Sequence, residues 1–268
     1  MDRQASSHSM KGKPVSEHVR VEKSDGVLAI TFARPERRNA ITIAMYAVLA
    51  EAIESAATDP EVRVITLRGE GQDFAAGNDL ADFLTVVPRT NEEIPVWRLL
   101  RVLAENEVPL LAAVHGNCVG IGTTLLLHCD VVIAANDTRF SLPFVDLGLV
   151  PEAASSLLLP RLAGRRRTAR YLLLCEPFGA DEALAIGLAS YVTAPDRLRE
   201  ALSDVVQRLV AKPAGALRAA QHLLRQGSRE EVLERMRLES DAFAERLQSD
   251  EAKQAINSFL EGRKRRPT

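Results

Sequence analysis

The stretch Pro109-Leu-Leu-Ala-Ala-Val-His115 is followed by the turn Gly116-Asn-Cys-Val-Gly-Ile-Gly122, a helical pattern from Thr123 to Cys129, and Val131-Val-Ile-Ala-Ala135. The two short apolar runs are typical of buried strands. Two parallel strands need a crossover between them, and a helix usually supplies it. This order of strand, turn, helix and strand therefore predicts an α/β architecture.

The same alternation extends on both sides of this stretch. Upstream, Val19–Ser24 and Val27–Phe32 flank Asp25-Gly26, a dipeptide that favours a two-residue hairpin turn. Further elements are predicted as helices over 43–57, 92–105 and 123–129, and as strands over 62–68 and 139–142. Their spacing is roughly constant, which suggests a repeated structural unit, although no clean sequence repeat is present.

From about Leu198 onward the strand patterns stop. Three helical patterns follow, over 196–211, 214–226 and 229–260. The last is too long to bury its apolar face against itself, so we expect it to dock on a neighbouring subunit, with its own core as the alternative. The positions that need a partner are Leu233, Met236, Phe243, Leu247, Ala255, Ile256 and Phe259.

The composition excludes several classes of protein. The chain has 268 residues, of which 46% are hydrophobic, enough for a substantial core. It has 34 basic and 36 acidic side chains, which give a net charge of −2. The protein as a whole therefore has no positive electrostatic field that would attract nucleic acid or an anionic membrane. No apolar run approaches the roughly 20 residues that cross a bilayer. We therefore expect a globular protein without nucleic-acid or membrane partners.

The cysteines and the first residues of the chain indicate the cellular compartment of the protein. Cys118, Cys129 and Cys175 are odd in number and lack CxxC spacing, which favours a reducing compartment over a disulfide or zinc framework. Residues 1–14 are polar and lack the apolar core of a secretory signal, so they are predicted as a disordered tail. The histidines have no metal-ligand spacing, and no metal is expected. The sequence predicts a cytoplasmic protein.

Two glycine-bearing turns follow predicted strands. Ala75-Ala-Gly-Asn-Asp-Leu80 is the first, and the turn from Gly116 to Gly122 is the second. Neither contains G-x-G-x-x-G nor the Gly-Lys-Ser/Thr of a phosphate-binding loop, which argues against those two types of nucleotide site. Backbone N–H groups at such turns are free to point at an anion. Each glycine alone is more often a plain turn residue, but together the turns predict an oxyanion hole.

These residues resemble the crotonase superfamily, also called the enoyl-CoA hydratase/isomerase family. The matching segments are Arg34 to Ala40, Phe74 to Leu80, Ala113 to Gly116, Cys129-Asp130, Phe140 to Ser156 and Phe259 to Pro267. The resemblance implies a spiral core of repeated ββα units over residues 15–197. It also implies a C-terminal helical trimerisation region over 198–268 and assembly as a homotrimer or a dimer of trimers.

The resemblance further implies an acyl-CoA thioester substrate, with CoA entering as part of the substrate and no separate cofactor. Its carbonyl oxygen would accept hydrogen bonds from the backbone N–H groups of Asn78 and Ile121. The remaining residues expected in substrate binding are Ala76, Gly77, Asp79, Leu80 and Gly122. Arg34, in the loop after the first hairpin, is a candidate contact for CoA phosphates, with a solvated charge as an equal alternative. The polar stretch 87–91 is a candidate mobile loop over this site.

Hydratases of this family resemble one another in carrying two glutamates, but Thr124 and Phe144 occupy those positions here. Glu152 instead lies at a position that looks like the single catalytic glutamate of peroxisomal-type Δ3,Δ2-enoyl-CoA isomerases. The resemblance implies a one-base shift of the double bond in fatty-acid oxidation. The alternatives are a hydratase or another crotonase reaction aided by Asp146, a non-catalytic CoA-binding scaffold, and a purely structural Glu152 in the first turn of a helix that starts at Pro151.

Overall fold

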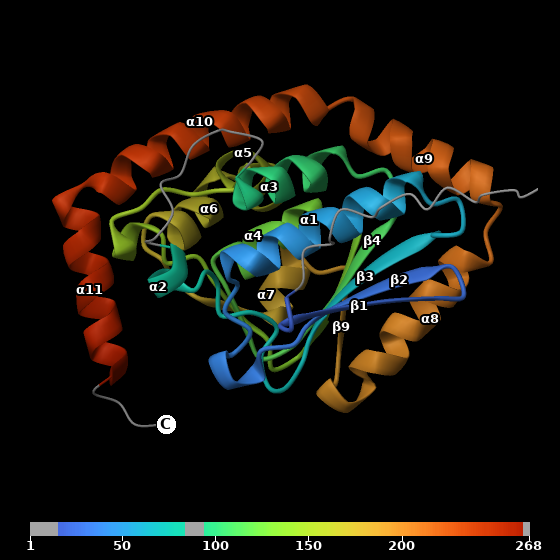
Figure 1. Cartoon of the computed structure of the whole chain (residues 1–268), viewed down its shortest axis with the longest axis horizontal. Helices are drawn as coiled ribbons and strands as arrows, with labels where there is room; N and C mark the ends of the chain where they lie inside the picture. The colour runs from blue at the N-terminus through green and yellow to red at the C-terminus, as the bar shows by residue number, and fades with distance from the viewer. Residues whose placement is uncertain (1–15, 84–93, 265–268) are drawn as a thin grey trace, which may run out of the picture.

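The computed structural model describes residues 16–83 and 94–264, and Figure 1 shows their arrangement. Its larger sheet has six strands in the order β1-β2-β3-β4-β6-β9. Only β1 and β2 are antiparallel; the remaining neighbours are parallel. The strands are β1 (Val19–Ser24), β2 (Val27–Phe32), β3 (Val64–Gly69), β4 (Leu110–Val114), β6 (Val131–Ala135) and β9 (Tyr191–Thr193). The predicted α/β architecture is confirmed.

A second sheet completes a spiral. It contains β5 (Asn117–Val119), β7 (Arg139–Ser141) and β8 (Phe178–Gly179), in the order β5-β7-β8. The chain runs from β4 in the large sheet to β5 in the small one and then into a helix, and it repeats this step from β6 to β7. Each turn is therefore a ββα unit, and the crotonase-like fold class is confirmed.

Helices cover both faces of the large sheet (Figure 1). On one face, α1 (Ile43–Thr58) packs against α3 (Pro95–Glu105), and their apolar sides join the main core. On the other face, α8 (Leu198–Val210) lies against β4 and β6 through a small cluster around Leu198, Ala113 and Ile133. The first helix after residue 197 thus shares a core with the sheet.

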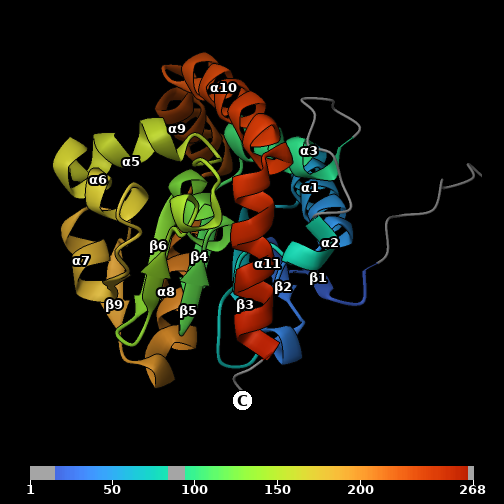
Figure 2. The same ribbon diagram turned by 90° about the vertical axis from the view of Figure 1, so that its left-hand side faces the viewer.

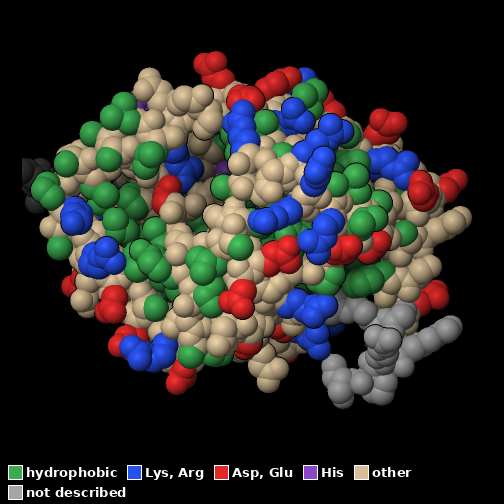
Figure 3. Space-filling model, turned by 180° about the vertical axis from the view of Figure 1, so that it is seen from behind, with side chains coloured by type: hydrophobic (Ala, Val, Ile, Leu, Met, Phe, Trp, Pro, Cys, Tyr) green, Lys and Arg blue, Asp and Glu red, His purple; other side chains and the backbone are tan. Residues whose placement is uncertain are grey.

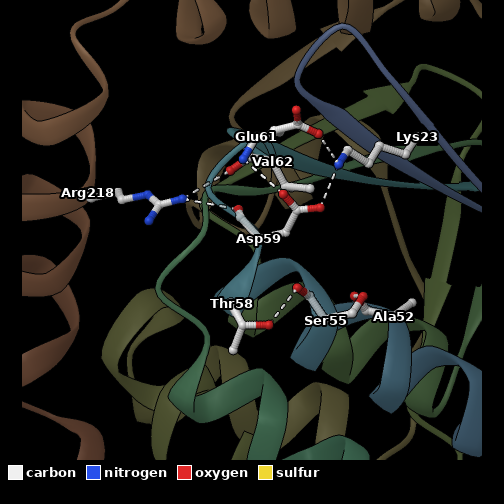
Figure 4. A network of polar contacts seen from close by, with 8 residues as sticks. All are labelled: Lys23, Ala52, Ser55, Thr58, Asp59, Glu61, Val62 and Arg218. Carbon is white, nitrogen blue, oxygen red and sulfur yellow. Dashed lines mark hydrogen bonds and ion pairs between the residues drawn. The ribbon is translucent and has the colours of Figure 1, made fainter. Parts of the chain in front are cut away.

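The opening hairpin turns as its sequence predicts. Asp25 and Gly26 both have positive φ, 50° and 79°, which is the requirement of a type I′ turn. Lys23 donates to Asp59 and Glu61 at 2.6 Å each, so the hairpin is tied to the turn between α1 and β3 (Figure 4). Arg218, in α9 (Ala214–Gln226), donates to the carbonyl of Asp59 in the same turn.

The prediction of one long helix over 229–260 is wrong, because two helices cover this range. These are α10 (Arg229–Gln248) and α11 (Asp250–Lys264), and they are separated at Ser249, whose backbone is extended. The Ser249 hydroxyl accepts the N–H of Ala252, the bond of a helix N-cap, and Asp250 and Glu251 follow in the first turn. Serine followed by two acidic residues is itself a helix-start pattern.

The expectation that these helices bury their apolar positions on a neighbouring subunit is wrong for most of those positions. Met236, Phe243, Leu247 and Ile256 are buried in the core of their own chain. Figure 2 shows α10 at the top of the molecule and α11 running down the face that is turned toward the viewer. Of the predicted set only Phe259, in α11, is a large apolar side chain that is exposed in the described part of the chain.

Several elements between residues 117 and 193 differ from the sequence-based expectation. The helix predicted over 123–129 is α4 (Ile121–Thr124) followed by the 3-10 turn η2 (Leu125–His128). In this range the elements that the patterns did not predict are β5, β8, β9, η3 (Val145–Leu147), α5 (Ser155–Ala163), α6 (Arg165–Leu172) and α7 (Ala180–Ala185). Within 16–83 and 94–264, no helix is both long and apolar enough to span a bilayer. The predicted tail 1–14 lies outside the described residues.

Candidate active site

Glu152 lies in a tight turn just before α5. The helix starts at Ser155, so the alternative that placed Glu152 in a helical first turn is wrong. The reason is the backbone of Ala153 and Ala154, which have φ values of 58° and 56° and delay the helix. Alanine rarely adopts this left-handed conformation, so surrounding contacts must hold it.

Two side chains hold this turn. His128, in η2, has its Nε2 at 2.8 Å from the carbonyl oxygen of Ala153. Burial lowers the pKa of His128 to about 4, so the ring is neutral and its Nε2–H donates to that carbonyl. From α10, the Glu239 carboxylate accepts the N–H of Ala154 at 2.6 Å and that of Ser156 at 2.9 Å. These contacts fix the position of Glu152.

The Glu152 carboxyl is buried and incompletely paired. The residue is 6% exposed, and its Oε1 has no hydrogen-bond partner among the described residues. Burial, and then the negative charge of Glu239, raises the pKa of Glu152 from 4.5 to about 8. A carboxyl with a pKa near neutrality is suited to take and return a proton.

The two glycine-bearing turns lie against each other. Ala75 pairs with Cys118, and the N–H of Val119 donates to the carbonyl of Ala75 at 2.9 Å. A side chain on Gly122 would put its Cβ 2.9 Å from that of Ala75, and Gly77 has a φ of 86°. Close approach therefore requires glycine at 122, and the left-handed backbone favours glycine at 77.

This pairing leaves two N–H groups unused. Ile41 bonds to Gly77 and Asp79, on either side of Asn78, so the N–H of Asn78 points to the opposite side. Ile121 is the first residue of α4, where an N–H has no intrahelical acceptor. Within the part of the chain that the structure describes, neither N–H donates to a protein acceptor. Both turns can therefore offer a donor to a bound oxygen.

Tyr46 contacts the glycine turn at Asn78 and lies near Glu152. Its phenol, at the buried side of α1, donates to the side-chain oxygen of Asn78 at 2.6 Å. Burial, and then the charge of Glu152, raises the pKa of Tyr46 well above its ordinary value, so the phenol keeps its proton. Sequence reasoning missed Tyr46, since a tyrosine in an apolar helix pattern does not differ from a core residue.

The remaining residues of the first turn have supporting contacts. Arg34 donates to Asp79 at 2.7 Å and to the carbonyl of Ala40 at 3.1 Å, so its guanidinium braces the turn. Asp79 also accepts the N–H of Ala81 at the start of α2 (Leu80–Phe83). Ala76 is half-buried, and Leu80 packs on the core. A role for Arg34 in binding CoA phosphates stays a prediction.

The two positions where the resemblance places hydratase glutamates are buried and hold no acid. Thr124 is fully buried, and Phe144 is 4% exposed within the core. The Thr124 hydroxyl has no partner among the residues described. Asp146, the alternative second carboxylate, is exposed in η3 and lies beside Cys175. No described contact brings Asp146 to Glu152.

Other candidates do not join this cluster. Burial raises the pKa of the Cys118 and Cys129 thiols, so neither is a ready nucleophile. Over residues 16–83 and 94–264, no group of three His, Cys, Asp or Glu is placed to hold a metal ion. A cleft of about 830 Å³ is lined by arginines and acidic residues, among them Arg68, Asp73 and Arg199, but by none of the candidate site residues. The loop 87–91 lies outside the described residues.

Comparison with known proteins identifies the family. The family model "Enoyl-CoA hydratase/isomerase" matches residues 22–267. The chain belongs to this family. It is 29% identical to a crotonyl-CoA hydratase of Syntrophomonas wolfei, covering 92% of this chain and 96% of the relative. It is 31% identical to enoyl-CoA delta isomerase 2 of Rattus norvegicus, covering 91% of this chain and 64% of the relative.

The fold agrees with that of solved members of the enoyl-CoA hydratase/isomerase family. An enoyl-CoA hydratase/isomerase from Pseudoalteromonas atlantica superposes with a TM-score of 0.87 at 36% identity, over 94% of this chain and 99% of that one. A hydratase and an isomerase are similar to the chain at almost the same identity. Membership therefore gives the class of enzyme, and the choice between the two reactions depends on the site.

Proposed function

We propose that this enzyme converts a 3-enoyl-CoA into a trans-2-enoyl-CoA by moving one proton. The observation that supports this most is the buried carboxyl of Glu152, which has an unpaired oxygen and lies near Tyr46, while Thr124 and Phe144 occupy the two positions of the hydratase acids. A 1,3-proton shift requires one base, whereas adding water requires both a base and an acid.

In this mechanism the Glu152 carboxylate removes a proton from C2 of the substrate. The electron pair left at C2 moves toward the thioester oxygen and gives an enolate. The N–H groups of Asn78 and Ile121 donate to that oxygen, and each such donor is worth on the order of 3 kcal/mol in the transition state. Protonated Glu152 then returns its proton to C4, and the double bond lies between C2 and C3.

The raised pKa of Glu152 fits both halves of this cycle. A carboxyl with a pKa of about 8 is basic enough to accept a proton from the carbon next to a thioester. The same carboxyl, once protonated, is still a far stronger acid than the carbon acid that forms at C4, so it can return its proton to the enolate. An exposed glutamate with an ordinary pKa would do the first step less well.

Hydration is the second candidate, and the similarity to a crotonyl-CoA hydratase favours it. Hydration requires, besides Glu152, a second group that holds the water or delivers the proton. The Thr124 hydroxyl, which is buried and has no partner among the described residues, lies at one of the two hydratase positions. A hydroxyl orients a water but does not deprotonate it near neutral pH. This makes hydration the weaker candidate.

Measuring turnover of both substrates tests the proposal. Purified enzyme is given 3-enoyl-CoA and, separately, trans-2-enoyl-CoA, and products are separated by chromatography. Isomerisation of the first without hydration of the second supports the proposal. Hydration that survives in Glu152→Gln would refute it, and no turnover of either compound would favour a CoA-binding scaffold.

We further propose that the enzyme assembles as a homotrimer or a dimer of trimers. Four leucines are more than 60% exposed, in two pairs: Leu173-Leu174 after α6 and Leu223-Leu224 in α9. Large exposed apolar side chains grouped in this way are typical of subunit contacts. Figure 3 shows apolar side chains gathered on one half of the face opposite to that of Figure 1. Sedimentation velocity gives the assembly state directly.

A further inference from the structure

Glu239 is a second buried carboxyl at the candidate site, and the proton shift does not use it. It lies on α10, in the C-terminal helical region, and is 7% exposed. Its two oxygens accept the N–H groups of Ala154 and Ser156, 85 and 83 positions earlier in the chain. Other acidic residues of α10, such as Glu245, are exposed on the surface.

The contacts of Glu239 act on the backbone that carries Glu152. Ala154 is one of the two alanines with a left-handed backbone, and Ser156 is the second residue of α5. A left-handed backbone is unfavourable for alanine, so the turn needs an external partner to keep its shape. His128 holds the carbonyl of Ala153, and Glu239 holds the N–H of the next residue.

We propose that Glu239 is a positioning residue, which fixes the turn that carries Glu152 and places a second negative charge beside it. The charged and titratable groups around this pair come from three elements: Tyr46 of α1, His128 of η2, and Arg235 and Glu239 of α10. Tyr46 and His128 are neutral. Arg235 faces Ser156 and Glu239, so it favours the ionised form of Glu239 rather than that of Glu152.

Glu239 and Glu152 consequently lose their protons one after the other as the pH rises. Burial raises the pKa of both, but N–H donors and Arg235 favour the ionised form of Glu239, whereas Oε1 of Glu152 has no partner in the described chain. Glu239 ionises first, and its charge then opposes ionisation of Glu152. Helix α10 thus controls both the position and the basicity of Glu152. The effect on catalysis rests on the proposed function, whereas the effect on ionisation does not.

An infrared titration measures ionisation of Glu152 without turnover. The C=O band of its protonated carboxyl is assigned by its loss in Glu152→Gln. We expect this band to disappear around pH 8 in the native enzyme. In Glu239→Gln the midpoint should fall by roughly one unit, because the neighbouring charge is gone. Glu245→Gln, the control on the exposed side of α10, should keep the native midpoint.

Glu239→Asp separates charge from position. It keeps a carboxylate but is one methylene shorter, so it loses the bonds to Ala154 and Ser156. The midpoint should stay above that of Glu239→Gln, while kcat with 3-enoyl-CoA falls about tenfold and KM changes little, as expected for a misplaced base. If Glu239→Gln does not fold, this variant alone decides, and a native kcat in it would overturn the proposal.

A native midpoint in Glu239→Gln, with kcat equal to that of Glu245→Gln, would also overturn it. The two proposals fail separately. A shifted midpoint in an enzyme that does not isomerise 3-enoyl-CoA refutes the proposed function and supports the positioning role. Isomerisation with an unshifted midpoint and native kcat does the reverse.

Discussion

The phenol of Tyr46 donates a 2.6 Å hydrogen bond to the side chain of Asn78, whose backbone N–H points away from Ile41. Tyr46 also lies close enough to Glu152 to sense its charge. One buried hydroxyl thus holds the side chain of the residue that carries the proposed oxyanion donor, and it lies near the proposed base.

Tyr46→Phe should therefore damage catalysis more than stability. Loss of one hydrogen bond costs about 1 kcal/mol of unfolding free energy. A displaced Asn78 donor should lower kcat about tenfold with 3-enoyl-CoA. Tyr191→Phe is the control, since Tyr191 is 47% exposed. Equal kcat values for the two variants would show that Tyr46 does not position the donor.

The raised pKa of Glu152 predicts a pH-dependent stability. In the unfolded chain this carboxyl ionises near 4.5, and in the native state near 8. Between these values the native state binds a proton that the unfolded state has lost, so stability falls as pH rises from about 5 to 8. The Glu152→Gln variant has no carboxyl at this position, so its stability does not fall in this way. At pH 8 its free energy of unfolding should exceed that of the native protein by on the order of 2 kcal/mol. Urea denaturation at several pH values measures the difference, which should shrink toward pH 5; a constant difference would contradict the raised pKa.

Asn39 should be a strong determinant of stability. It is fully buried, accepts the N–H of Arg34, and donates to the carbonyls of Glu70 and Asp73. Asn39→Ala leaves these groups without partners and should cost about 3 kcal/mol. The exposed Asn136 provides the control, for which we expect a change of roughly 0.5 kcal/mol or less on Asn136→Ala. Similar melting curves for both variants would contradict this assignment.

The break between α10 and α11 also predicts a measurable cap. Ser249→Ala removes the acceptor for the N–H of Ala252 and should destabilise the protein by about 1 kcal/mol. Ser249→Asp keeps an acceptor and should restore most of that loss. Thermal unfolding of the three proteins compares them, and an Asp variant as unstable as the Ala variant would argue against the cap.

Much of the fold followed from local patterns. The Asp25-Gly26 turn, the buried strands and the helices that flank them have short-range patterns, and the structure confirms their types. The Ser249 cap was also present in the sequence but was hidden by an apolar pattern that continues through it. The turn before α5 had no such pattern, because Ala153 and Ala154 adopt a conformation that alanine seldom does.

The site divides in the same way. Glu152, Asn78 and Ile121 stand in recognisable segments, and the sequence alone proposed them. Tyr46 and Glu239 could not be found this way, since they reach the site from distant helices through one and two hydrogen bonds, respectively. Their importance depends on which helix faces which turn, and that is a property of the tertiary structure.

The central claim is that one carboxyl, Glu152, moves the proton. The most direct measurement is kcat for 3-enoyl-CoA in Glu152→Gln, with binding of the product trans-2-enoyl-CoA measured by calorimetry in the same variant. We predict that kcat falls at least about a thousandfold while product affinity stays near that of the native enzyme. Isomerisation at a near-native rate in Glu152→Gln would contradict the account.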